Sequence, residues 1–287
     1  MKAVIDIGSN SVRLLVFNDR SDFVKGVTAT EITRLGHKLL ESGHLSKAGI
    51  AATWKAFDLF AEILKDHGIV QVEAYATEAV RKATDGEAFV QEVTQRYGWH
   101  VRIIDGEEEA LIGFLGATSA LPEGSYTMLD IGGASTEMIQ GSAQLEYRHS
   151  FPIGALRLTD EPHTDLSEVF ADLPPLRGEL IGIGGTITTV LAMTLALETY
   201  ERKFIHGKKL TKAALQKWVD IFPSMPQALR LQLPGLDPKR EPIIWAGMKI
   251  LLHLMERFNQ TELIVSDYGN LEGYAMSRGL CDTNTLT

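Results

Sequence analysis

The sequence contains a single cysteine, Cys281, and no long run of uncharged apolar residues. One cysteine excludes an intramolecular disulfide and a cysteine-based zinc site. No stretch reaches the roughly 18 apolar residues of a membrane-spanning helix. The chain begins with strand-like residues rather than with a basic segment before an apolar signal region. These absences predict a cytoplasmic protein that does not associate with membranes.

The sequence also lacks a surplus of basic residues. Its formal net charge is −9, which argues against general nucleic-acid binding because that binding needs a basic surface. A polyanionic substrate held by a local basic groove stays compatible with this charge. The length of 287 residues predicts about two domains. We expect an N-terminal lobe over residues 1–117 and a C-terminal lobe over 118–287, with the last helix able to pack back on the first lobe.

One stretch, Met128–Glu137, combines an apolar segment, an aspartate, two glycines and small hydroxyl residues. This pattern predicts a strand, a tight turn and a second strand. Successive backbone N–H groups in such a turn form a cradle for an anion. The carboxylates of Asp130 and Glu137 flank the cradle, and carboxylates there suit a metal ion or a positioned water. The stretch therefore indicates phosphate transfer or phosphate hydrolysis.

The stretch Val4–Leu14 repeats this pattern near the start of the chain. Four positions correspond in order: Asp6 with Asp130, Gly8 with Gly132, Ser11 with Ser135, and Arg13 with Glu137. Two copies predict two related halves. Arg13 lies between apolar residues beside Ser9, Asn10 and Ser11, which favours a phosphate ligand over an edge arginine that reaches solvent.

Two further segments resemble parts of a phosphate site. A third glycine-rich turn, at residues 181–186, leads into an apolar helical segment, and its Gly185 and Thr186 are candidate phosphate ligands. Arg81 and Lys82 follow the predicted strand at 72–76. Ligands of α/β sheets lie beyond the carboxyl ends of strands, although a solvated surface pair explains these two residues equally well.

Three consecutive glutamates, Glu107 to Glu109, begin a predicted helix that runs to about Ala117. Acidic residues at a helix N-terminus are stabilised by the helix dipole, and this alone accounts for one or two of them. Because the helix is expected to pass from the first half to the second, a carboxylate at its start is also a candidate general base toward an attacking water.

Two basic segments stand out in the acidic chain. The segment Arg202–Lys212 is the more basic, and we interpret it by default as a solvated loop; a groove for a polyanion is the alternative. The segment Arg34–Lys38 is a smaller basic loop.

Strands and helices alternate along most of the chain. The hydrophobic pattern predicts strands at 3–7, 12–17, 30–34, 72–76, 101–104, 146–151 and 263–267. It predicts helices at 47–67, 86–97, 186–197, 243–258 and 270–278. Alternating elements with two duplicated hairpins predict an α/β protein with two lobes around a central cleft.

Several motifs together resemble those of the exopolyphosphatase/guanosine pentaphosphate phosphohydrolase family. They are Asp6–Arg13, Ala76–Arg81, Gly106–Ala110, Asp130–Glu137 and Gly184–Thr186, extended by Ile205–Gly207 and Val265–Asp267. The resemblance implies two ribonuclease-H-like lobes of the actin-like ATPase and sugar kinase superfamily. It also implies Mg²⁺-assisted removal of a terminal phosphate by water.

The resemblance assigns roles to residues of this chain. Glu109 matches the general base, and Asp130 and Glu137 match the acidic residues at the metal and water site. The phosphate-holding positions match Ser9, Asn10, Ser11, Arg13 and Arg81, and the backbone of Gly132 and Gly133 would hold phosphate from the other side. Ser135 is a further candidate phosphate ligand. Ala134 departs from the family pattern, which has a third glycine there, so this residue must avoid a positive φ or be strained.

We expect a phosphoric anhydride hydrolase that releases terminal orthophosphate from inorganic polyphosphate, with short chains preferred. Guanosine pentaphosphate is the rival substrate. An ATP-dependent kinase of the same fold and a non-catalytic phosphate or nucleotide sensor are the alternatives from other classes. Self-association as a homodimer stays open.

Overall fold

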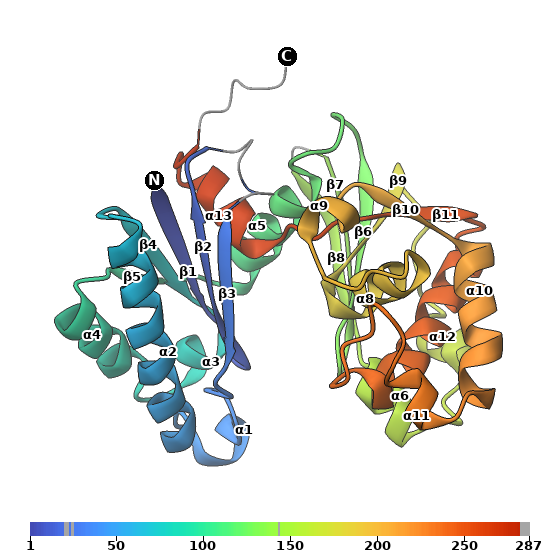
Figure 1. Cartoon of the computed structure of the whole chain (residues 1–287), viewed down its shortest axis with the longest axis horizontal. Coiled ribbons are helices and arrows are strands. Elements are labelled where there is room, and N and C mark those ends of the chain that lie inside the picture. The colour runs from blue at the N-terminus through green and yellow to red at the C-terminus, as the bar shows by residue number, and fades with distance from the viewer. Residues whose placement is uncertain (20–22, 24–25, 143, 282–287) are drawn as a thin grey trace. The chain divides into compact units, whose positions relative to one another are not determined.

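The computed structural model describes residues 1–19, 23, 26–142 and 144–281 and divides the chain into two compact units (Figure 1). Unit 1 holds the described residues of 1–116 and 269–287, and unit 2 holds the described residues of 117–268. The division after Gly116 adjoins the expected boundary between residues 117 and 118. The chain returns to unit 1 for its last helix.

The sheet of unit 1 is built around a strand that is buried along nearly its whole length. In β1 (Lys2–Ile7) every residue after Lys2 is buried, as expected for a central strand covered on both faces. The strand order is β3-β2-β1-β4-β5. The β1–β2 and β2–β3 pairs are antiparallel, whereas β4 and β5 continue parallel to β1. The other strands are β2 (Ser11–Phe17), β3 (Val27–Ile32), β4 (Val72–Ala76) and β5 (Val101–Ile103).

The sheet of unit 2 repeats this topology. Its order is β10-β11-β9-β6-β7-β8, so β8, β7, β6, β9 and β11 correspond to the five strands of unit 1, and β10 is an added edge strand. The strands are β6 (Tyr126–Ile131), β7 (Thr136–Gly141), β8 (Leu145–Phe151), β9 (Glu179–Ile183), β10 (Lys208–Thr211) and β11 (Glu262–Val265). The repeated order confirms the two related halves and the ribonuclease-H-like α/β fold.

Helices cover both faces of the first sheet (Figure 1). The helix α2 (Lys47–Asp66) begins at the predicted residue, because the hydroxyl of Ser46 accepts a hydrogen bond from the Gly49 N–H at 3.1 Å. On the opposite face, Tyr274 of α13 (Asn270–Ser277) stacks on Tyr75 with ring centroids 4.4 Å apart. The remaining helices of this part are α1 (Leu39–Ser42), α3 (Glu78–Lys82), α4 (Gly86–Tyr97) and α5 (Gly106–Thr118).

Two apolar helices dominate the core of unit 2. They are α8 (Gly184–Thr194) and α12 (Glu241–Arg257), whose buried residues include Ile187, Val190 and Leu251. The others are α6 (Ala155–Asp160), α7 (Leu166–Val169), α9 (Arg202–Ile205), α10 (Lys212–Ile221) and α11 (Gln227–Arg230), with a 3₁₀ turn at Phe222–Ser224. Across the described residues, no helix combines the length and apolar character needed to cross a bilayer.

Two sequence predictions of secondary structure were wrong in detail. The segment Arg202–Lys212 is no loop: it forms α9 and β10, because Lys208–Thr211 pairs with β11 and this pairing outweighs the charge. Lysines on an edge strand also discourage pairing with further chains. The strand predicted at 30–34 is β3 at Val27–Ile32, since its pairing with β2 sets its position.

Candidate functional site

The two sequence repeats fold into the same turn, once in each unit. In the first, the N–H of Gly8 donates to the carbonyl of Ser11 at 3.0 Å. In the second, the N–H of Gly132 donates to the carbonyl of Ser135, also at 3.0 Å. We name these the first turn (residues 8–11) and the second turn (residues 132–135).

Each turn presents two adjacent backbone donors. Among the described residues, the N–H groups of Ser9 and Asn10 in the first turn make no hydrogen bond, and the same holds for Gly133 and Ala134 in the second. Neighbouring N–H groups that point out of a turn attract an anion. Gly133 and Ala134 are exposed, so their donors are accessible to a ligand.

The glycines of the second turn let a ligand come close to the backbone. They are not needed for an unusual backbone conformation. Ala134 is not among the residues with a positive φ, so its departure from the family pattern brings no backbone strain. A Cβ added at Gly133 would find its nearest neighbour, the Cβ of Leu156, at 3.7 Å, which is ordinary contact. Packing within the chain therefore does not require glycine at 133, whereas a phosphate close to the backbone would.

Beside the first turn, strand pairing places Asp6 opposite Arg13. The Arg13 Nε donates to Asp6 Oδ2 at 3.0 Å, and the charge of Asp6 raises the pKa of Arg13 above its ordinary value. Asp6 is only 2% exposed, and its Oδ1 has no hydrogen-bond partner within the described chain. Asp6 is a site residue that our sequence assignment left out, although it matches Asp130 in the repeat.

Beside the second turn, the same register places two carboxylates, Asp130 and Glu137, opposite each other. Like charges at directly opposed positions destabilise a sheet, so this pair suits a bound cation. Glu137 Oε1 accepts hydrogen bonds from the hydroxyls of Ser135 at 2.5 Å and Ser150 at 2.8 Å. These bonds orient the carboxylate and occupy the Ser135 hydroxyl.

The chemistry of this pair fits Mg²⁺. The described residues hold no group of three or more His, Cys, Asp or Glu side chains that could bind a metal. Mg²⁺ does not need one, because it is typically bound by one or two carboxylates together with waters and substrate phosphates. Asp130 and Glu137 are the residues that would hold it.

The third turn, Gly184–Thr186, adjoins Asp130. Gly184 has φ +78°, and a Cβ there would lie 2.1 Å from Asp130 Oδ1, so only glycine fits. The Thr186 hydroxyl donates to the Ile131 carbonyl at 2.8 Å, and the residue is 3% exposed. Thr186 therefore ties the third turn to the end of β6, and its hydroxyl does not face solvent.

Arg240 was missed by the sequence analysis. A Cβ at Gly185 would lie 1.7 Å from Arg240 Nη2, so the guanidinium packs directly against the third turn. Arg240 precedes α12, far from Gly185 in the sequence. No local pattern marks it, because only the packing of α12 beside α8 brings it to this place.

The three glutamates at the start of α5 differ in their contacts. The carboxylate of Asp105 accepts the N–H groups of Glu107 and Glu108 at 2.9 and 2.8 Å and so caps the helix. Glu108 pairs with Arg102, with Arg102 Nη2 3.1 Å from Glu108 Oε2. Glu109 instead lies 3.8 Å from Arg81 Nη1, a group that also donates to the Ile104 carbonyl.

Strand pairing gathers these residues at matching edges of the two sheets. The first turn, Arg81 and Glu109 follow the carboxyl ends of the parallel strands β1, β4 and β5. The second and third turns follow the carboxyl ends of β6 and β9. Carboxyl ends of parallel strands are where α/β folds bind ligands. Each unit thus assembles its own set of predicted site residues.

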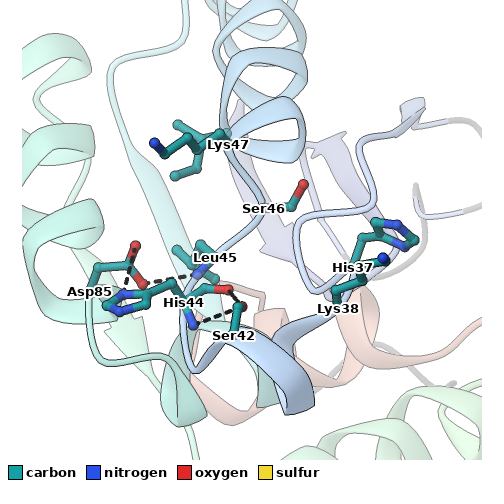
Figure 2. A pocket seen from close by; sticks show the side chains of 9 residues that line it. His37, Lys38, Ser42, His44, Leu45, Ser46, Lys47 and Asp85 are labelled. Carbon is teal, nitrogen blue, oxygen red and sulfur yellow. Dashed lines mark hydrogen bonds and ion pairs between the residues drawn. The ribbon is translucent and has the colours of Figure 1, made fainter.

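A pocket of about 650 Å³ lies in unit 1 (Figure 2). Its lining is His37, Lys38, Ser42, His44, Leu45, Ser46, Lys47, Ile50 and Asp85. The loop that carries His37 and Lys38 is bonded to the first turn, because the Gly36 N–H donates to the Ser9 carbonyl at 2.8 Å.

The basic segment Arg202–Lys212 is largely engaged by carboxylates. Arg202 pairs with Asp267 at 3.2 Å, and both side chains are less than one fifth exposed. Lys203 pairs with Glu201 and Lys209 with Glu262, each at 2.5 Å. The Arg202–Asp267 pair holds its cation firmly, whereas the two lysine pairs are about half exposed and weaker.

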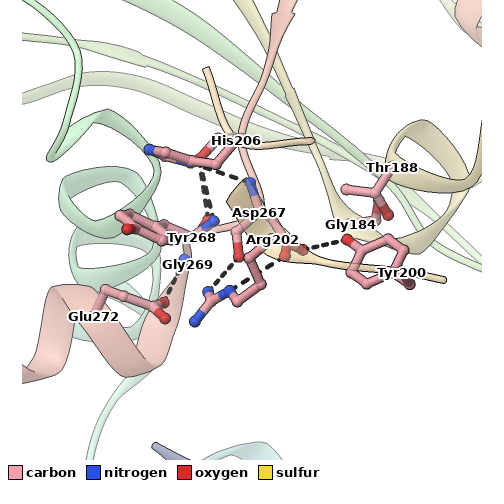
Figure 3. A network of polar contacts seen from close by, with 10 residues as sticks. Gly184, Thr188, Tyr200, Arg202, His206, Asp267, Tyr268, Gly269 and Glu272 are labelled. Atoms are coloured by element: carbon pink, nitrogen blue, oxygen red, sulfur yellow. Dashed lines mark hydrogen bonds and ion pairs between the residues drawn. The ribbon is translucent and has the colours of Figure 1, made fainter. Parts of the chain in front are cut away.

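Arg202 and Asp267 belong to a polar network that Figure 3 shows at the end of β11. The hydroxyl of Tyr200 donates to Asp267 Oδ1 at 2.7 Å. The imidazole of His206 stacks on Tyr268, with ring centroids 3.7 Å apart. Burial, and secondarily the charge of Arg202, lowers the pKa of His206 to about 4, so this histidine is neutral at pH 7.

Comparison with known proteins agrees with this arrangement. The model of the Ppx/GppA phosphatase family matches residues 16–280. The chain belongs to the Ppx/GppA phosphatase family. A solved Ppx/GppA family member from Aquifex aeolicus is 33% identical, with a TM-score of 0.80 and 97% of each chain covered. The Ppx/GppA fold of the chain is that of the actin-like ATPases.

Two curated relatives are each 28% identical to this Ppx/GppA protein. Exopolyphosphatase 2 of Mycobacterium tuberculosis matches 96% of the chain and 97% of its own length. A bifunctional 3-dehydroquinate synthase/phosphatase of Fusobacterium nucleatum matches 95% of the chain but only 46% of its own length. The chain therefore spans about half of the Fusobacterium protein.

The buried histidine makes unit 2 of this Ppx/GppA protein sensitive to acid. In the unfolded chain His206 binds a proton near its ordinary pKa of 6.5, whereas in the folded chain it binds one only near pH 4. The stabilisation by the neutral histidine is thus complete above pH 6.5 and is lost as pH falls to about 4. The free energy of unfolding falls by at most about 3 kcal/mol over this range. His206→Phe keeps an aromatic ring beside Tyr268 and should flatten this dependence. Urea denaturation between pH 4 and 7 measures it.

The exposed His163 of the same unit supplies the control. His163→Gln should leave the dependence on pH as steep as in the wild type. An equally steep dependence in His206→Phe would show that His206 is not the responsible group.

Proposed function

We propose that the protein is an exopolyphosphatase that removes the terminal phosphate of short inorganic polyphosphate chains by attack of water. The observation that supports this proposal most is the pair of turns with unused backbone donors, each at the carboxyl end of a central strand. Such turns grip a terminal phosphate without reading a base or a sugar. The similarity to an exopolyphosphatase of Mycobacterium tuberculosis over nearly its full length supports the same substrate class.

Within this proposal Glu109 is the general base. Its carboxylate is half-buried and lies beside Arg81, and the N–H of Glu109 bonds to the Asp105 carbonyl in the first turn of α5. Glu109 accepts a proton from the attacking water. In unit 1 the donors of the first turn and Arg81 bind phosphate oxygens, and in unit 2 the donors of the second turn and Arg240 do so. Phosphoryl transfer depends mainly on such positioning and on electrostatic stabilisation.

Asp130 and Glu137 would hold Mg²⁺, which when bound neutralises charge on the phosphoryl group. The hydroxyls of Ser135 and Ser150 keep Glu137 oriented for this task. Asp6 is held by Arg13 instead of by a second carboxylate. We therefore expect the metal ion at the β6–β7 hairpin of unit 2 and not at the β1–β2 hairpin of unit 1.

The preference for short chains follows from the distribution of basic residues. A long polyanion needs many cationic contacts along its length. In the segment Arg202–Lys212, residues Arg202, Lys203 and Lys209 are already paired with carboxylates. This segment thus offers few cations to a long chain.

The test is the release of orthophosphate from tripolyphosphate, from longer linear chains, from guanosine pentaphosphate and from ATP. We expect the highest kcat/KM on short polyphosphates. A guanosine pentaphosphate value about tenfold above every polyphosphate would move the assignment to that nucleotide. Phosphate transfer from ATP to a sugar would indicate a kinase, and binding without turnover would indicate a sensor.

The contacts of the glutamates separate the proposed base from its neighbour. Glu109→Gln should lower kcat by about 10² to 10⁴, the usual contribution of a general base, with KM nearly unchanged. Glu108→Gln is the matched control, because Glu108 is turned toward Arg102. Steady-state phosphate release measures both variants. If Glu108→Gln were the inactive one, the base would be one residue earlier.

Metal binding can be measured without turnover. Mg²⁺ at 100 times its dissociation constant should stabilise the wild type by about 2.7 kcal/mol, seen as a higher Tm. Asp130→Asn should lose this shift because one of two ligands is gone. Glu123→Gln removes an exposed carboxylate of the same unit and should keep it. An unchanged shift in Asp130→Asn, or full activity in excess EDTA, would place the metal elsewhere or outside the reaction.

A further inference from the structure

The pocket in unit 1 (Figure 2) has more lysines than carboxylates in its lining, although the protein as a whole carries a net charge of −9. Two lysines, Lys38 and Lys47, and two histidines, His37 and His44, line it against one carboxylate, Asp85. Its volume of about 650 Å³ is large enough for a small anionic ligand. Neither the two phosphate turns nor the metal site uses any of these residues.

The single carboxylate of the lining is already engaged. Asp85 Oδ1 accepts the N–H of Leu45 at 3.0 Å, and Oδ2 lies 3.7 Å from His44 Nδ1. Figure 2 shows His44 and Asp85 on one side of the pocket and His37 and Lys38 on the other. Lys38 lies 3.9 Å from Glu41, and both side chains are more than 60% exposed, so this pair is weak. The lysines thus retain most of their capacity to attract an anion.

Lys47 occupies a position that the helix itself does not favour. It is the first residue of α2, a helix of 20 residues that has no acidic residue in its first turn. A cation at a helix N-terminus is disfavoured by the helix dipole, whereas an anion is favoured. A basic residue there is consistent with a ligand that carries negative charge.

The pocket is coupled directly to the first turn. The N–H groups of Arg34 and Gly36 donate to the carbonyls of Asn10 and Ser9 at 2.9 and 2.8 Å. Lys38 follows Gly36 by two residues, so their Cα atoms are at most about 8 Å apart. The loop that carries Lys38 is thus fixed to the first turn, and the pocket and the turn belong to the same unit.

We propose that this pocket binds the distal phosphates of an inorganic oligophosphate whose terminal phosphate is held by the first turn. The inference rests on the proposed function and adds a subsite to it. Because Lys38 and Lys47 supply the strongest charges, the gain in affinity with chain length ends once the pocket is filled. The pocket thereby sets the chain length at which kcat/KM stops rising.

The test is the double variant Lys38→Gln/Lys47→Gln. Glutamine keeps most of the side-chain length, and removal of the cation from the start of α2 favours folding. The matched control, Lys55→Gln/Lys65→Gln, changes the same charge at two exposed positions of the same helix. Initial rates of phosphate release are measured on tripolyphosphate and on a series of longer linear chains, at several salt concentrations.

In the pocket variant we expect KM for the longer chains to rise about tenfold, as for lost charged contacts. The slope of log KM against log salt should fall by about one for each lysine removed. Activity on tripolyphosphate should change less than twofold, and the control should match the wild type. An equal loss on all chain lengths, or none on any, would overturn the proposal.

Two further measurements distinguish a wrong assignment of the pocket from a wrong proposed function. Equilibrium dialysis with labelled pyrophosphate, at saturating tripolyphosphate and in the inactive Glu109→Gln background, tests for a separate small anion. Pyrophosphate binding that disappears in the pocket variant while KM for long chains stays unchanged would assign the pocket to such an anion and overturn the distal-phosphate subsite. If the wild type hydrolyses no polyphosphate, the proposed function fails. The subsite is then judged by dialysis of a long polyphosphate, and equal binding by wild type and pocket variant would overturn it as well.

Discussion

The register of two antiparallel hairpins is the constraint on which the candidate site depends. In unit 1 it sets Asp6 against Arg13, and in unit 2 it sets Asp130 against Glu137. One topology thus gives a neutralised acid in one copy and two opposed acids in the other. Because opposed like charges are unfavourable in a sheet, a cation bound between them would stabilise the second hairpin. The duplicated fold has in this way produced two turns with different chemistry.

Parallel pairing then collects the other groups around these hairpins. The strands β4 and β5 run parallel to β1, so Arg81 and Glu109 follow strands that end near the first turn. The strand β9 runs parallel to β6, so the third turn lies beside Asp130. Because Gly184 and Gly185 have no side chains, Asp130 packs against the first and Arg240 against the second. A one-residue slip in the pairing of β6 would turn Asp130 to the other face of the sheet.

The cations of the two units differ in how firmly carboxylates hold them. The basic segment Arg202–Lys212 serves the structure of unit 2, where Arg202 and Asp267 are partly buried partners. The lysines at 38 and 47 have no such partners of comparable burial and line a pocket instead. The number of cations in a segment therefore does not show which of them a ligand can reach, because a partly buried ion pair such as Arg202–Asp267 holds its cation in place.

The sequence by itself determined the features that depend on neighbours along the chain. Alternating apolar residues and glycine turns gave both hairpins, and Ser46 with the apolar spacing after it gave the start of α2. It did not reveal that Glu108 is held by Arg102 while Glu109 lies beside Arg81. Nor did it reveal the guanidinium of Arg240 against Gly185 or the ion pairs of β10. These features were decided only by tertiary structure, because each joins residues that no local pattern relates and that meet only when helices and strands pack.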